Sequence, residues 1–170
     1  MDIPSESNRE FEIEICDTQS HVFVDPDRLR ATALHILKEE QIIRANISIA
    51  LVDDEALHQI NRRYLGHDWP TDVVTFCLSE VSADVLVGEL IISCEMAAAQ
   101  ARERGVPAMR ELALYVVHGL LHLCGYDDQR DSDAAEMRFR ELVHLETLGF
   151  SDNFGASFAG LQCGGATCTE

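Results

Sequence analysis

The chain has 170 residues, of which 46% are hydrophobic and 25% are charged. This is enough for one compact domain, and the composition excludes collagen-like, fibrous and wholly disordered proteins. Lys and Arg total 13 against 30 Asp and Glu, so the formal net charge is -17. Such a charge disfavours a protein that coats DNA without sequence preference, because phosphate contact requires positive charge. A nucleic acid can still be a substrate if a bound cation or a local group of arginines offsets the repulsion.

The sequence carries no signal for secretion or for a membrane span. Residues 1–11 have neither a basic nor an apolar segment of the secretory type, so we expect a cytoplasmic protein. The longest apolar stretch, residues 112–123, is shorter than the roughly 20 residues that cross a bilayer, and we expect a buried helix there. In the cytoplasm the six cysteines are expected to be reduced thiols.

Periodicity predicts the elements in chain order. Alternation of apolar and polar residues predicts strands, and apolar residues at helical spacing predict helices. The expected strands are 11–16, 46–52, 73–77 and 85–92, the last two as an antiparallel pair. The expected helices are one that begins at Asp25-Pro26 and carries apolar residues to Leu37, then 54–64, 94–104, 108–123 and 131–148. Strands interleaved with helices and followed by a helical end predict one mixed sheet covered by helices.

Three parts of the chain differ in composition. Residues 1–10 are predicted to be a flexible leader, and residues 11–148 carry all the expected elements and form a single folded domain. Residues 149–170 are rich in Gly, Ser, Thr and Ala and contain two cysteines. Segments with so little bulky apolar content do not bury enough surface to fold, so this part is predicted to be a flexible tail.

The most informative segment is LYVVHGLLHLCGYDD, residues 114–128. It places His118 and His122 four positions apart in an apolar helix, so both imidazoles lie on one face and can reach one point. The competing interpretation is two core histidines, but burying two imidazoles without partners costs several kcal/mol. We therefore interpret the pair as ligands of a metal ion.

The residues after the second histidine can complete such a site. Gly125 allows the helix to end and the chain to turn back, which brings Asp128 within reach as the third ligand, with Asp127 and Asp131 as alternatives. Gly119 stands where the H-E-x-x-H metalloproteases have their general-base glutamate, so a protease mechanism is disfavoured. A catalytic metal with an open position that activates water and stabilises developing negative charge suits a phosphodiester substrate.

Three blocks of the sequence resemble the signature blocks of the YbeY family. They are WPTDVVTF at residues 69–76, GELII at residues 88–92 and HGLLHLCGYDD at residues 118–128, in the family's order and spacing. The resemblance covers about residues 11–148. It implies an α+β fold with a mixed four-stranded sheet, about five helices and a zincin-like metal helix. It also implies a metal-dependent endoribonuclease that is specific for single strands and acts in 3′-end maturation of the small-subunit (16S) ribosomal RNA and in ribosome quality control.

Two positions depart from the family pattern. The family normally has a histidine where this chain has Asp128, but two histidines and one carboxylate can also hold catalytic zinc. We therefore expect one zinc ion at His118, His122 and Asp128, while the added negative charge also permits iron, manganese or nickel. After Tyr64 the family commonly has an arginine that serves RNA binding or catalysis, and this chain has Leu65 there.

Four residues are candidates for substrate binding. Arg62 and Arg63 are close to the position of the family arginine, although they also fit a solvated helix end. Thr71 and Asp72 match the family's P-T-[DN] loop, which borders the cleft. They could orient substrate or water, and Asp72 could equally cap or brace that loop.

Most other charged groups are expected to be solvated. Glu141 belongs to a last helix of mixed charge, which is typical of an exposed face. Arg102, Arg104 and Arg110 surround the turn before the metal helix, where a solvated turn is favoured over contact with phosphate. The histidines outside the pair are expected to be surface or packing residues.

The sequence thus predicts a monomeric, cytoplasmic metallohydrolase that cuts single-stranded or ribosomal RNA without contacting a membrane. Its acidic surface could dock a basic ribosomal or ribosome-assembly protein. Two alternatives stay open. Two histidines and a carboxylate also form the facial triad of non-haem Fe(II) oxygenases. The second alternative is a ribosome-associated binding factor with a structural metal. It is suggested by the acidic composition and by Leu65 in place of the arginine.

Overall fold

A computed structural model describes residues 9–65, 71–80, 83–150 and 164–165. Its sheet consists of β1 (Glu10–Asp17), β2 (Arg44–Val52), β3 (Val73–Cys77), β4 (Leu86–Ser93) and the two-residue β5 (Gly164–Gly165). The strand order is β1-β2-β4-β3-β5. β1, β2 and β4 are mutually parallel, β3 is antiparallel to β4, and β5 is parallel to β3. The four predicted strands and the antiparallel pair are confirmed, and β5 extends the sheet beyond β3.

The helices are α1 (Pro26–Glu39), α2 (Asp54–Ile60), α3 (Cys94–Arg104), α4 (Ala108–Leu123) and α5 (Asp131–Thr147). Side chains that accept backbone N–H groups set three of the helix starts, as expected for capping residues: Asp25 for α1, Asp53 for α2 and Ser93 for α3. The helix predicted over residues 54–64 is present, but its type changes along its length. The α-helix ends at Ile60 and continues as a π-helix, η2 (Asn61–Leu65), where the fully buried Asn61 donates to Thr71 Oγ1 at 2.6 Å.

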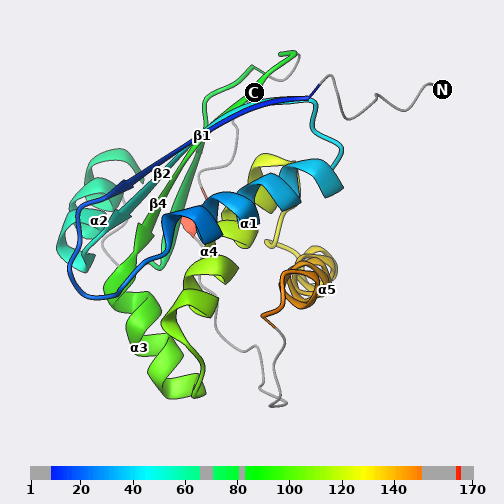
Figure 1. Ribbon diagram of the computed structural model, residues 1–170. Coiled ribbons are helices and arrows are strands. Elements are labelled where there is room, and N and C mark those ends of the chain that lie inside the picture. The colour runs from blue at the N-terminus through cyan, green and yellow to red at the C-terminus, as the bar shows by residue number, and fades with distance from the viewer. Residues whose placement is uncertain (1–8, 66–70, 81–82, 151–163, 166–170) are drawn as a thin grey trace.

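The helices cover the two faces of the sheet unequally. On one face, α1 and α4 pack against the sheet, and α4 also contacts α3 and α5 (Figure 1). Alternate residues of β2, such as Ile47 and Ile49, point into this larger core, whereas Val52 contributes to a smaller one beneath α2. The period-two alternation that predicted the strand therefore also sorts its side chains between the two cores. α4 is buried along nearly its whole length, which makes it the central helix.

Glycine allows α4 to approach the sheet closely. A Cβ atom on Gly119 would lie 2.5 Å from Leu90 Cδ2 and 3.0 Å from Thr75 Oγ1. A larger residue at this position would push the helix away from β3 and β4. Gly119 therefore faces the sheet, and the glutamate of the metalloprotease motif would not fit there. The close approach sets the position of the second half of α4, which carries both histidines.

Several predictions concern the ends of the chain, its cysteines and membranes. Most of the predicted leader and tail lies outside the described residues, although Glu10 already begins β1. In the described part of the chain, the cysteines are free thiols, as predicted: Cys16, Cys77, Cys94 and Cys124. Among the helices of those same residues, none combines the length and the apolar character that crossing a membrane requires.

Candidate metal centre

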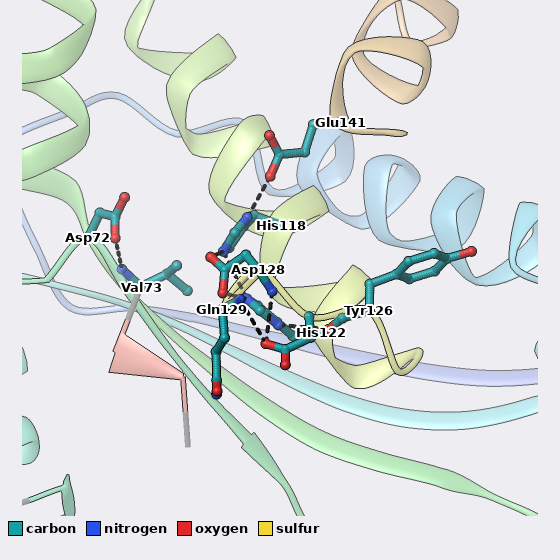
Figure 2. A network of polar contacts seen from close by, with 9 residues as sticks. Asp72, Val73, His118, His122, Tyr126, Asp128, Gln129 and Glu141 are labelled. Carbon is teal, nitrogen blue, oxygen red and sulfur yellow. Dashed lines mark hydrogen bonds and ion pairs between the residues drawn. The ribbon is translucent and has the colours of Figure 1, made fainter. Parts of the chain in front are cut away.

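Two histidines meet at the C-terminal end of α4. The Nε2 atoms of His118 and His122 are 3.0 Å apart, and the two rings are edge to face with centroids separated by 4.6 Å (Figure 2). The His118 side chain is 2% exposed and that of His122 is 14% exposed. The i and i+4 positions thus bring two imidazole nitrogens to one point, as the sequence predicted.

The turn after α4 brings a carboxylate to the same point. Gly125 has a φ of 99°, which glycine adopts without strain, and the chain reverses there. The two Asp128 carboxylate oxygens then lie 3.9 Å from Nε2 of His118 and 3.9 Å from Nε2 of His122. Asp127 instead accepts the backbone N–H groups of residues 128 and 129 and so shapes the turn. The structure therefore brings together Asp128, rather than Asp127, with the two histidines.

The donor set fits a divalent transition metal. Among the described residues, His118, His122 and Asp128 form a group whose ligand atoms all lie within 4.8 Å of one another. Tetrahedral ligands at about 2.0–2.1 Å from zinc are roughly 3.3 Å apart, close to the 3.0 Å between the two Nε2 atoms. Asp128 is 23% exposed, so the group is open to solvent on its carboxylate side. Catalytic zinc sites commonly have three protein ligands of these types and a fourth position for water or substrate.

The outer nitrogen of each histidine also has a partner. His118 Nδ1 lies 2.5 Å from Glu141 Oε1, and His122 Nδ1 lies 3.0 Å from the backbone oxygen of Tyr126. The expectation that Glu141 lies on an exposed face is wrong, because the residue is 1% exposed. Its spacing from the buried Met137 along α5 could have placed it on the inner face. The Tyr126 contact uses a backbone oxygen, which has no signature in the sequence.

Tyr126 is held in place from α1. Its hydroxyl donates to Glu40 at 2.9 Å, and Glu40 also contacts Arg140 at 3.1 Å and His144 at 3.3 Å. His144 in turn lies 3.3 Å from His35. The expectation of a packing histidine is met at His144, which is 5% exposed. This network joins the end of α1 to α5 and to the turn that carries the metal-site carboxylate.

Burial and neighbouring charges shift the pKa values of the two histidines in opposite directions. Burial by itself lowers the pKa of His118, but the hydrogen bond and the charge of Glu141 outweigh it, so the net pKa is raised above its ordinary value. The pKa of His122 is lowered, first by burial and then by the neighbouring His118. Of the pair, His122 is thus the imidazole that is more readily neutral.

Two residues of the P-T-D motif, Thr71 and Asp72, directly precede β3. Asp72 is 8% exposed, and its Oδ1 accepts the Val73 N–H at 3.0 Å. Figure 2 shows Asp72 and Val73 on the sheet side of His118, away from Glu141. Burial raises the pKa of Asp72 to about 6, against the opposing effect of His118. Thr71 is also buried and accepts from Asn61, so it braces the loop.

The predicted arginines occupy different environments. Arg62 and Arg63 are exposed in η2, the solvated helix end that the sequence allowed. The Arg63 guanidinium lies 5.6 Å from the centroid of the Tyr64 ring, which is 63% exposed. For Arg110 the expectation of a solvated turn is wrong. It is 4% exposed and pairs at 2.9 Å with Glu111, which is fully buried.

The family model described as Endoribonuclease YbeY matches residues 14–149. The chain belongs to the YbeY family. It is 41% identical over 128 residues to the Endoribonuclease YbeY of Desulfitobacterium hafniense, covering 70% of this chain and 80% of that protein. With the Endoribonuclease YbeY of Carboxydothermus hydrogenoformans it shares 38% identity over 138 residues, covering 80% of this chain and 96% of that protein. The three blocks seen in the sequence are therefore those of a YbeY protein.

A solved structure has a similar fold. The solution structure of TM1509 from Thermotoga maritima matches with a TM-score of 0.59 and 26% sequence identity. The match covers 85% of this chain and 99% of that one. Within the described residues, the α+β fold with its mixed sheet and five α-helices, expected from the resemblance to YbeY, is confirmed.

Proposed function

We propose that this chain is a metal-dependent endoribonuclease that cleaves single-stranded RNA. The observation that carries the proposal is the convergence of His118, His122 and Asp128 within 4.8 Å, at the end of the helix that bears the YbeY signature. The names of the relatives, Endoribonuclease YbeY, support phosphodiester hydrolysis as the reaction. One zinc ion is the proposed cofactor, and the carboxylate ligand also suits iron, manganese or nickel.

The protein groups have distinct tasks in this mechanism. A divalent metal bound here would activate water and offset the negative charge that develops on the phosphoryl oxygens. His118 and His122 would bind it through Nε2, because their Nδ1 atoms have other partners. Asp128 would supply the third ligand. The Val73 N–H holds the Asp72 carboxyl at the edge of the centre, where it can orient substrate or water.

The substrate follows from chemistry and family together. Arg62 and Arg63 are exposed and supply positive charge for phosphates in a chain with a net charge of -17. Within the family, the proposed substrate is small-subunit ribosomal RNA, with roles in 16S 3′-end maturation and ribosome quality control. We further propose a cytoplasmic location, a monomeric state and contacts with basic ribosomal or ribosome-assembly proteins.

The donor set bears on the two alternatives. A structural zinc site normally takes four protein ligands, whereas the candidate group among the described residues contains three. This favours a catalytic site over a binding factor with a structural metal. The same donors occur in non-haem iron enzymes, but the family match favours hydrolysis of RNA over oxygen chemistry.

Metal analysis combined with an RNA-cleavage assay tests the proposal. Protein purified without chelators or a polyhistidine tag should hold about one transition metal per chain. His122→Ala should lose it, Asp128→Ala should bind it more weakly, and the exposed His21→Ala should retain it. Cleavage of a labelled single-stranded oligoribonucleotide should follow the metal content, and a duplex should resist. A folded His118→Ala protein that lacks metal and still cleaves RNA at the full rate would refute the mechanism.

A further inference from the structure

A carboxylate on α5 meets the side of His118 that faces away from the metal position. Glu141 Oε1 lies 2.5 Å from Nδ1, and the two side chains are 1% and 2% exposed. Figure 2 shows Glu141 on one side of His118 and Asp128 on the opposite side. Glu141 thus contacts Nδ1, whereas Nε2 faces His122 Nε2 at 3.0 Å and Asp128 Oδ2 at 3.9 Å.

The burial of Glu141 is costly for the fold. Its second oxygen, Oε2, is buried and has no hydrogen-bond partner within the described part of the chain. A buried carboxylate with an unsatisfied oxygen destabilises a protein, and an apolar residue of similar size would pack at this position without that cost. The contact with His118 is the compensating interaction. Because its burial destabilises the fold, we interpret the contribution of this carboxylate as its interaction with His118, not as stabilisation of the fold.

The two histidines are held by acceptors of different strength. His122 Nδ1 faces the neutral backbone oxygen of Tyr126 at 3.0 Å, whereas His118 Nδ1 faces a carboxylate. A charged acceptor forms the stronger hydrogen bond and increases the electron density on the other ring nitrogen. The Nδ1 proton directed at Glu141 leaves the Nε2 lone pair for the metal position.

We propose that Glu141 is a positioning residue of the metal centre. It fixes the Nδ1-protonated tautomer and the ring orientation of His118, and it makes His118 the stronger donor of the two histidines. The inference rests on the proposed metal site. Glu141 acts through His118 and not directly on the substrate.

Zinc affinity measured by competition with a chelator tests this role. Glu141→Gln keeps the size and an acceptor oxygen but removes the charge, and we expect a loss of zinc affinity of about tenfold or more. Glu146→Gln makes the same charge change at an exposed position of the same helix and should stay within about twofold of the unmodified protein. In the zinc-loaded protein, the NMR signal of the His118 Nδ1 proton should move upfield in Glu141→Gln, because its acceptor is weaker.

The outcomes separate this inference from the proposed function. If Glu141→Gln folds, binds zinc as tightly as the unmodified protein and keeps the proton signal unchanged, the positioning role is wrong. If Glu141→Gln does not fold without metal, Glu141→Asp replaces it, and unchanged affinity and an unchanged proton signal in that variant likewise overturn the role. If the unmodified chain itself binds no zinc, the proposed metal site fails and this inference fails with it.

Discussion

Asp72 provides the sharpest test of the electrostatics around the metal centre. The residue is 8% exposed, and burial raises its pKa from 3.8 to about 6. Its folded pKa therefore exceeds its unfolded pKa, so the native state binds more protons between these two values. The contribution of this carboxyl to stability is fully present below pH 3.8 and is lost as the pH rises through about 6.

The size of the effect follows from the shift. A difference of about 2.2 pKa units, at 1.36 kcal/mol per unit, corresponds to about 3 kcal/mol. The variant Asp72→Asn has no titrating group but keeps an oxygen that can accept the Val73 N–H. Its free energy of unfolding should exceed that of the unmodified protein by less than about 1 kcal/mol at pH 4 and by about 3 kcal/mol above pH 7.

Urea unfolding of metal-free protein at several pH values measures this difference. Asp84→Asn, a matched change at an exposed aspartate, should give a difference that stays within about 0.5 kcal/mol at every pH. A bound cation favours the ionised carboxylate, so saturation with zinc should reduce the pH-dependent advantage of Asp72→Asn. An Asp72→Asn advantage of equal size at pH 4 and above pH 7 would refute the assignment of a raised pKa to this residue.

Three further predictions concern packing, substrate and metal. Gly119→Ala places a Cβ atom 2.5 Å from Leu90 Cδ2. The cost of overpacking exceeds the gain in helix propensity, so the free energy of unfolding, measured by urea denaturation, should fall by up to about 2 kcal/mol. An unchanged free energy of unfolding would contradict the close approach of α4 to the sheet. Arg62→Ala combined with Arg63→Ala should raise KM for single-stranded RNA on the order of tenfold at low salt while metal content stays constant, and an unchanged KM would exclude these arginines from RNA binding. The pKa of His118 is raised above 6.5, so protons should compete with zinc, and zinc affinity should begin to decline, at a pH above 6.5. Chelator competition from pH 8 to 5.5 measures this affinity. A decline that begins only below pH 6.5 would contradict the prediction.

Local sequence information was sufficient for much of the fold and for the centre of the site. Strands and helices with a strong apolar period were placed within a residue or two, because burial on one face imposes that period on the chain. The pair His118 and His122 is likewise local, since a helix alone brings positions four apart together. Gly125 signals the turn, and Asp128 follows within a few residues. The candidate metal ligands could therefore be proposed from one short segment.

Tertiary structure decided the features that join segments distant in the sequence. Glu141 lies 23 positions after His118, and although its spacing from Met137 fits the inner face of α5, that spacing does not show which group it meets there. The π-helical turn at Asn61 similarly depends on its contact with Thr71, ten positions later. Residue type and periodicity report on one element at a time, whereas burial of a charge depends on what another element presents to it. The sequence by itself determined which atoms could bind a metal, and only the packing of α5 and β3 against α4 decided which groups surround them.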